Sequence, residues 1–189
     1  MYEISRYNQV NILGTSHLLD ILANESHSIK KMIIASSRSI YGEGKYLCKN
    51  NGVVYPSKRQ DIDMNKGEFN LVCNKCNEPL QLLATDEDSK VHPSSIYGIT
   101  KQQQEQMILL IGKTLNIPAV ALRYQNVYGP GQSLSNPYTG ILSIFSTRLL
   151  NGNDIDIYED GQESRDFVFI DDVVSATILA LEKNEANHQ

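Results

Sequence analysis

The hydrophobic and polar positions of the chain follow two kinds of pattern, one helical and one extended. From Tyr7 to about Asn24, apolar residues recur with the spacing of an amphipathic helix. Residues 30–37, KKMIIASS, form a short apolar run that ends in small polar residues, which is typical of a buried parallel strand. A second helix is predicted over about 94–115 and a second buried strand over 118–124. This order of elements favours right-handed crossovers and an α/β fold with a parallel sheet.

The segment from about residue 43 to residue 92 interrupts this rhythm. It is too long for a connecting loop and too poor in periodic apolar residues for a regular crossover, so we interpret it as an insertion. The pattern after Tyr124 is again regular. It predicts a loop rich in Gly, Pro and Asn, a helix at 140–150, short strands at 155–158 and 167–170, and a helix at 171–182 capped by Asp171 or Asp172.

Composition narrows the class of function. The 189 residues are 41% hydrophobic and 21% charged, which suits one folded domain or a domain and a piece. The net charge of −5 disfavours nucleic acid and anionic membranes as partners and directs attention to a small-molecule site. We expect a cytoplasmic protein, because the start shows no secretion signal and no apolar run is long enough to span a membrane.

The stretch SSIYGITK carries the first candidate chemistry. Tyr97 and Lys101 lie four residues apart at the start of the second predicted helix, so both side chains point to one side. A nearby ammonium favours the phenolate form of a tyrosine, which makes Tyr97 a candidate proton acceptor. The alternative interpretation is an ordinary surface pair, because this spacing is common.

Polar side chains also follow each predicted strand. Ser36 and Ser37 end the first strand, and Tyr124 to Asn126 end the second. In open parallel sheets, ligands bind outside the carboxyl ends of the strands. Arg165, just before the strand predicted at 167–170, is suited to a bidentate contact with phosphate.

Five segments in this order resemble the extended short-chain dehydrogenase/reductase family of nucleotide-sugar epimerases and dehydratases. They are NQVNILGTSHLLD, SSRSIYGEG, SSIYGITK, ALRYQNVYGPG and ESRDFVFIDDV. The resemblance implies a Rossmann-like doubly wound parallel sheet. It divides the chain into a partial NAD-binding domain, residues 1–135 with the insertion, and a partial substrate-binding region, residues 136–189.

The resemblance also implies a role for each matching residue. Tyr97 would be the catalytic acid and base, Lys101 would lower its pKa and bind the nicotinamide ribose, and Ser37 would orient the reacting hydroxyl. Asn11, Ser36, Tyr124 and Gln125 would lie beside the NAD cofactor, together with Tyr97 and Lys101. The substrate would be bound by Ser37, Arg38, Ser39, Asn126 and Arg165.

The activity implied is epimerisation at carbon 4 of a nucleotide sugar, with dTDP-L-rhamnose and dTDP-6-deoxy-L-talose as the expected pair. The family's dehydratases carry an acidic pair after this serine, whereas Arg38 and Ser39 stand here. A 4,6-dehydratase and a UDP-sugar 4-epimerase remain alternatives. A third alternative, of another class, is an inactive remnant that acts as a zinc-dependent interaction module.

One family feature is not found in the sequence. No GxxGxxG or GxGxxG turn occurs, although that turn holds the cofactor pyrophosphate in the family. We therefore expect a fragment lacking the first strands, with weak or no NAD binding and no turnover by itself. At full length we expect a homodimer formed through residues 8–20 and 101–113.

The insertion contains Cys48 and the pair Cys73-x2-Cys76. A CxxC pair before a turn is typical of a zinc knuckle, but Asn51 stands where the other knuckle would place its second ligand. Zinc held by the three cysteines, completed by His92 or water, is one interpretation. Three reduced cysteines in a loop is the other.

Overall fold

The computed structural model describes residues 3–134 and 140–189. At its centre two strands, β1 (Met32–Ser37) and β5 (Ala119–Tyr124), pair in parallel. Met32 lies opposite Ala119 at one end and Ser37 opposite Tyr124 at the other. Both strands therefore end at the same edge, with their polar residues together. The predicted α/β class with a parallel sheet is confirmed.

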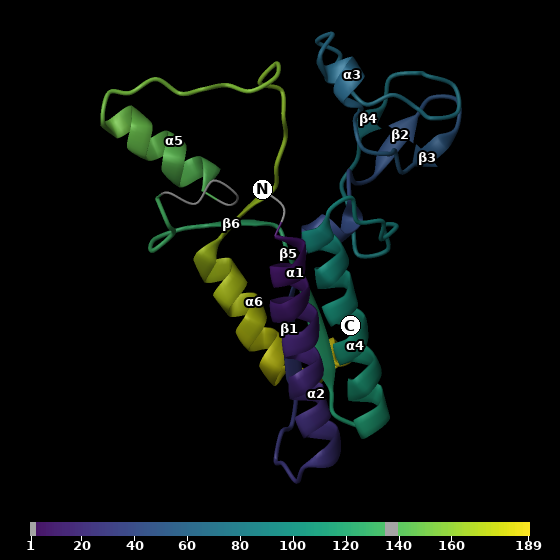
Figure 1. The fold of residues 1–189 in the computed structure, drawn as a ribbon, viewed down its shortest axis with the longest axis vertical. Coiled ribbons are helices and arrows are strands. Elements are labelled where there is room, and N and C mark those ends of the chain that lie inside the picture. Colours follow the sequence, from purple (N-terminus) through teal and green to yellow (C-terminus); the bar gives the residue numbers. More distant parts are fainter. Residues whose placement is uncertain (1–2, 135–139) are drawn as a thin grey trace.

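Two long helices run side by side along this pair of strands (Figure 1). The first is continuous and consists of α1 (Ile4–Tyr7), a π-helical stretch η1 (Asn8–Leu13) and α2 (Gly14–Asn24). The second is α4 (Ile96–Leu115), which begins where the Ser95 hydroxyl accepts a hydrogen bond from the Gly98 amide and ends at Asn116 in the left-handed conformation. None of the helices in the described ranges is long and apolar enough to cross a membrane.

The strands carry helices on both faces. Ser36 of β1 and Arg123 of β5 contact Glu105 of α4, whereas Tyr124, one residue on, contacts Thr177 of α6 (Ile170–Glu182). Successive residues of a strand point to opposite faces, so α4 and α6 cover opposite sides of the strand pair. This is the arrangement of a doubly wound fold.

A small apolar core joins α2 and α4 to the strands. It consists of Leu19, Met32, Ile117 and Ala119, with partly buried side chains of α2 and α4 packed around it. Gly112 allows α4 to approach β5 closely, because a Cβ there would lie 2.8 Å from the Cβ of Ala119. Glycine at this position therefore sets the spacing between the helix and the sheet.

The C-terminal part is more open. β6 (Asn126–Tyr128) pairs in parallel with β7 (Phe167–Phe169), and α5 (Ile141–Leu150) lies apart from the strand pair β1 and β5 (Figure 1). A short helical turn, η3 (Asn184–Ala186), follows α6. Part of the predicted Gly/Pro/Asn loop, and the boundary predicted at residues 135 and 136, lie outside the described residues.

Two predictions for this part were wrong. Residues 155–158 form no strand, and Ile157 and Tyr158 are largely exposed, because no neighbouring strand offers them a ladder. Helix α6 begins at Ile170, its N-cap is Phe169, and no side chain caps it. Asp171 and Asp172 lie inside its first turn, where carboxylates interact favourably with the helix dipole.

The insertion forms its own small sheet. A short helical turn, η2 (Arg38–Tyr41), leads into it from β1. Three antiparallel strands follow in the order β3 (Gly52–Val54), β2 (Tyr46–Cys48) and β4 (Gln81–Leu82), and α3 (Asp61–Met64) lies between β3 and β4 in the chain. Figure 1 shows this segment projecting away from the long helices.

Candidate active site

A cavity of about 1100 Å³ opens at the carboxyl ends of β1 and β5. We call it the strand-end cavity. Asn11 is the one predicted catalytic, cofactor or substrate residue that does not line it. The others do: Ser36, Ser37, Arg38, Ser39, Tyr97, Lys101, Tyr124, Gln125, Asn126 and Arg165. Residues far apart in sequence thus meet at the edge where parallel strands end.

Tyr97 and Lys101 reach the cavity from the first turns of α4. The Lys101 ammonium donates to the carbonyl oxygen of Ala35 at 3.0 Å and lies 5.8 Å from the centroid of the Tyr97 ring. Burial raises the pKa of Tyr97, and a hydrogen bond with the Ser37 side chain partly offsets that effect. Burial also lowers the pKa of Lys101. The net direction for Tyr97 is thus opposite to the lowering expected from the sequence.

Ser37 is positioned by the turn that follows β1. Its Oγ accepts hydrogen bonds from the Ser39 amide at 3.2 Å and from the Ser39 hydroxyl at 2.9 Å. These two donors occupy the acceptor sites of the hydroxyl, so its own proton is available on the side of Tyr97. The pair can therefore hold a substrate hydroxyl and exchange a proton with it.

Asn11 lies behind the cavity. Its amide donates to the Thr100 hydroxyl at 3.0 Å, and that hydroxyl donates to the carbonyl oxygen of Tyr97 at 2.9 Å. Asn11 belongs to the π-helical stretch η1, and such irregular turns often occur at functional sites. In this arrangement Asn11 supports the first turns of α4.

A buried polar network underlies the strand-end cavity. The Ser36 hydroxyl donates to Glu105 at 2.7 Å, and the Arg123 guanidinium binds the same carboxylate, with Nη2 2.6 Å from Oε1. Arg123 also donates to the Tyr41 hydroxyl at 2.6 Å. The Glu105 side chain is only 8% exposed, so this pair holds α4 to both strands from inside.

No role was predicted from the sequence for Glu105, Arg123 or Tyr41. The available signals were an arginine within a predicted buried strand and an acid one helical turn after Lys101. The network also shows that the hydroxyl of Ser36 is used for structure, although the residue lines the cavity.

The second strand end supplies Tyr124, Gln125 and Asn126. The Tyr124 hydroxyl lies 2.7 Å from that of Thr177 on α6, which fixes the ring against the strand end. Gln125 and Asn126 line the cavity where β5 passes into β6. These side chains therefore line the strand-end cavity at the end of β5, next to Ser37 at the end of β1.

Arginines from two segments give the cavity its positive charge. Arg38 and Arg165 both line it, and burial together with the charge of Arg165 lowers the pKa of Arg38. The two positively charged guanidiniums repel each other. A phosphate group bound between them would therefore be stabilised by both charges.

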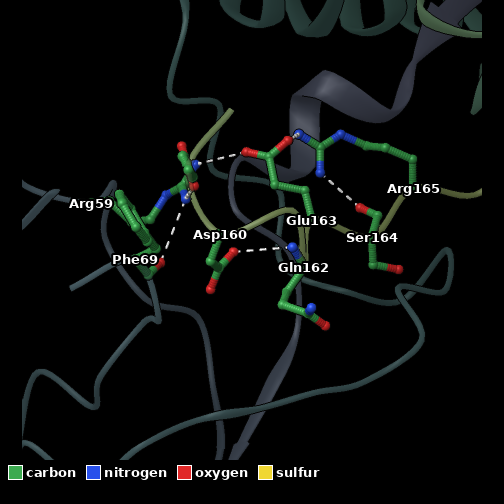
Figure 2. A network of polar contacts seen from close by, with 8 residues as sticks. Arg59, Phe69, Asp160, Gln162, Glu163, Ser164 and Arg165 are labelled. Atoms are coloured by element: carbon green, nitrogen blue, oxygen red, sulfur yellow. Dashed lines mark hydrogen bonds and ion pairs between the residues drawn. The ribbon is translucent and has the colours of Figure 1, made fainter. Parts of the chain in front are cut away.

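Figure 2 shows how Arg165 is held. Glu163 bridges two arginines, with Oε2 3.1 Å from Nη2 of Arg165 and Oε1 3.5 Å from Nη2 of Arg59 in the insertion. Arg59 also pairs with Glu159. These groups line a second cavity of about 860 Å³, to which Arg38, Gln125 and Arg165 also contribute. Arg59 is a further residue for which the sequence predicted no role at the site.

The three cysteines lie together in the insertion. The sulfurs of Cys48, Cys73 and Cys76 are all within 4.8 Å of one another, and we call them the cysteine cluster. The Asn51 side-chain amide lies within 3.5 Å of all three sulfurs. Of the two completing ligands considered, His92 or water, His92 does not lie at the site. Its ring packs against Tyr55, outside the cluster.

The amino-acid sequence is similar to those of known proteins. The model of the NAD dependent epimerase/dehydratase family matches residues 73–189. Over 180 residues, or 95% of the chain, the sequence is 36% identical to a dTDP-L-rhamnose 4-epimerase of Burkholderia thailandensis. The match covers 48% of that relative, so the chain spans about half its length.

The fold is also similar to about half of each of two solved structures. A UDP-N-acetylglucosamine 4-epimerase from Methanobrevibacter ruminantium, in complex with UDP-N-acetylmuramic acid, superposes with a TM-score of 0.70 at 27% identity. A UDP-glucuronic acid 4-epimerase from Bacillus cereus in complex with NAD superposes with a TM-score of 0.66 at 26% identity. The two matches cover 96% and 98% of this chain, and 46% and 47% of the respective structures.

Proposed function

Because this chain belongs to the NAD dependent epimerase/dehydratase family, we propose that it forms the catalytic centre of a nucleotide-sugar 4-epimerase. The observation that carries the proposal is the meeting of Ser37, Tyr97 and Lys101 at one cavity beyond the ends of two parallel strands. The proposed substrates are dTDP-L-rhamnose and dTDP-6-deoxy-L-talose. The 36% identity to the Burkholderia thailandensis enzyme supports this choice of sugar.

Epimerisation is favoured over dehydration by the residues after Ser37. Elimination of a sugar hydroxyl needs an acid that protonates the leaving group. Arg38 and Ser39 occupy the positions where the family's dehydratases carry that acid, and a guanidinium does not donate its proton at neutral pH. The comparisons reported above lend no support to a separate role as a zinc-dependent interaction module.

The residues of the strand-end cavity suit NAD. The Lys101 ammonium is fixed beside Tyr97, and Tyr124 and Gln125 form the facing wall, so a nicotinamide ribose would find polar partners on both sides. Bound NAD would supply reversible hydride transfer at carbon 4 of the sugar. We assign Tyr97, Lys101, Tyr124, Gln125 and Ser36 to this half of the cavity, with Asn11 supporting α4 from behind.

Tyr97 is the group proposed to move the proton. It takes the proton of the 4-hydroxyl as carbon 4 is oxidised and gives it back when the opposite stereoisomer forms. Since burial raises the pKa of Tyr97, its phenolate needs positive charge close by, and the Lys101 ammonium supplies it. Ser37 holds the reacting oxygen through its hydroxyl, whose position the two donors of Ser39 fix.

The diphosphate is proposed to lie between Arg38 and Arg165. Phosphate oxygens would bring these two cations a shared counter-charge, and Asn126 can donate from the wall of the cavity. Ser39 lines the same side. In this proposal residues 1–135 hold NAD and residues 136–189 contribute to the nucleotide sugar.

We also propose that the protein is a homodimer. Residues 8–20 and 101–113 would form the interface. Val10, Leu13 and Leu18 of the first long helix and Leu110 of α4 are each at least 50% exposed in the chain described here. Apolar side chains in such positions on neighbouring helices are suited to helix pairing between subunits.

The test is an assay of the protein at its full natural length with dTDP-L-rhamnose and NAD, with the talose product followed by NMR. We expect turnover in the wild type. Tyr97→Phe should lower kcat about 10² to 10⁴-fold, because it removes the proton acceptor but leaves the ring in place. Lys30→Met, an exposed change outside the strand-end cavity and the proposed interface, is the control and should retain full activity.

Three outcomes would contradict the proposal. Loss of water from the sugar would identify a dehydratase, and turnover of UDP-sugars alone would change the nucleotide. Unchanged kcat in Tyr97→Phe would remove Tyr97 from the chemistry.

A further inference from the structure

The cysteine cluster is built too closely to be incidental. Cys48 and Cys73 are each 1% exposed, and the sulfurs of Cys48 and Cys76 lie 3.5 Å apart. A disulfide would require about 2.05 Å, so the three thiols are free. Zinc bound tetrahedrally at about 2.3 Å from each sulfur would place the sulfurs about 3.8 Å apart. The observed spacing matches that value far better than it matches a disulfide.

Two turns of equal length face each other across the cluster. In one turn, Cys73 and Cys76 are three residues apart, and Asn77 follows with a positive φ of 57°. Its backbone is closed by the Asn77 amide, which donates to the Cys73 carbonyl at 2.8 Å. In the other turn, Cys48 and Asn51 have the same separation, and Gly52 follows with a φ of 68°. Asn51 is therefore the counterpart of Cys76.

The Asn51 side chain confirms this position by its contacts. Its amide nitrogen lies 3.4 Å from the sulfur of Cys48, 3.5 Å from that of Cys73 and 3.1 Å from that of Cys76. An amide nitrogen carries two hydrogens, so it cannot donate a separate hydrogen bond to each of three sulfurs. Half a turn about the terminal torsion places the amide oxygen at the same point. Three sulfurs and one oxygen then surround a common centre.

We propose that Cys48, Cys73, Cys76 and Asn51 bind one Zn²⁺ ion, with the side-chain oxygen of Asn51 as the fourth ligand. Thiolates favour zinc over the hard cations Mg²⁺ and Ca²⁺, and each thiol gives its proton to solvent when the metal binds. All four positions are taken by the protein, which is the character of a structural site.

Such a site explains how the insertion holds its shape. Its strands contain only three, three and two residues, which is too short for an independently stable sheet. Cys48 and Cys73 are among the largest fully buried side chains of the described chain, where a larger domain would place aliphatic residues. The metal would join the β2–β3 turn to the Cys73 turn, which lies 25 residues along the chain from Cys48.

The test measures metal directly and needs no enzyme assay, so it is independent of the proposed function. The reduced full-length protein is purified without chelator, and its zinc is measured by mass spectrometry. The stripped protein is then titrated with Co²⁺. We expect close to one zinc per chain, together with the intense visible bands of tetrahedral cobalt and a thiolate-to-cobalt charge-transfer band. Zinc far below one per chain with no such cobalt spectrum would overturn the site.

Variants of Asn51 test the fourth ligand. Asn51→Cys should bind zinc more tightly and strengthen the charge-transfer band by adding a fourth thiolate. Asn51→Ala should weaken binding about tenfold or more, on the scale of lost metal-site partners. Asn74→Ala is the control from the opposite turn, since Asn74 contacts Ser57. Equal affinity and an equal cobalt spectrum for Asn51→Ala and the wild type would remove Asn51 from the site.

Discussion

The strand-end region and the insertion hold functional side chains in place by different means. In the first, β1, β5 and α4 meet through an apolar core and a buried ion pair, and the polar residues stand at the edge of that scaffold. In the second, the strands are short, and their centre consists of the buried sulfurs of Cys48 and Cys73 beside the more exposed Cys76 and Asn51. Packing and ligation can thus each fix side chains precisely, and the amount of apolar surface that a segment can bury determines which of the two is available.

The two regions also meet at the candidate substrate site. Arg59 of the insertion is linked through Glu163 to Arg165, which lines the strand-end cavity (Figure 2). We therefore expect changes in the core formed by β1, β5 and α4 to lower the global stability of the protein strongly. Changes in the insertion should cost little stability and should act on substrate binding.

The largest effect is expected from Glu105→Gln. This change leaves the Arg123 guanidinium without its counter-ion in a mostly buried position, which should lower the free energy of unfolding by about 3 kcal/mol. Urea unfolding followed by far-UV circular dichroism measures it. Glu182→Gln, an exposed change at the end of α6, is the control. A loss below about 1 kcal/mol would show that the pair does not hold the scaffold together.

A pair of glycine changes tests the packing of α4. Gly112→Ala should destabilise the protein by about 2 kcal/mol, because its Cβ would come within 2.8 Å of Ala119 and of the Ile117 carbonyl. Gly14→Ala, also inside a helix, has its nearest atom 3.7 Å away and should stabilise by about 0.5–1 kcal/mol. Thermal unfolding of both variants measures the two changes in stability. Shifts of the same sign would mean that the close approach of α4 and β5 does not limit this region.

The smallest effect on stability is expected from Arg59→Gln. Its ion pairs with Glu159 and Glu163 are partly exposed, so the free energy of unfolding should fall by less than about 1 kcal/mol. The freed Glu163 should then hold Arg165 more strongly and raise KM for the nucleotide sugar several-fold with little change in kcat. Lys58→Gln, an exposed neighbour, is the control. An unchanged KM would separate the insertion from the substrate site.

Much of the fold could be predicted from the pattern of residues. The long helices and both buried strands were predicted within about three residues, because their periodicity and their small polar ends are local properties. The segment 155–158 failed for the same reason. A short apolar run becomes a strand only where a partner strand is present, and its own residues do not carry that information.

The candidate site also contains some features that could be predicted from the sequence and others that could not. The candidate catalytic side chains, such as Tyr97 and Lys101 on one helix and Ser37 at a strand end, could be named from the amino-acid sequence, since residue type and spacing are fixed along the chain. The three-dimensional fold was needed to show that Glu105 and Arg123 pair beneath them, that Arg59 reaches Glu163, and that Asn51 lies among three sulfurs. Most of these contacts join residues 18 to 104 positions apart, and only the folding of the backbone brings such groups within bonding distance.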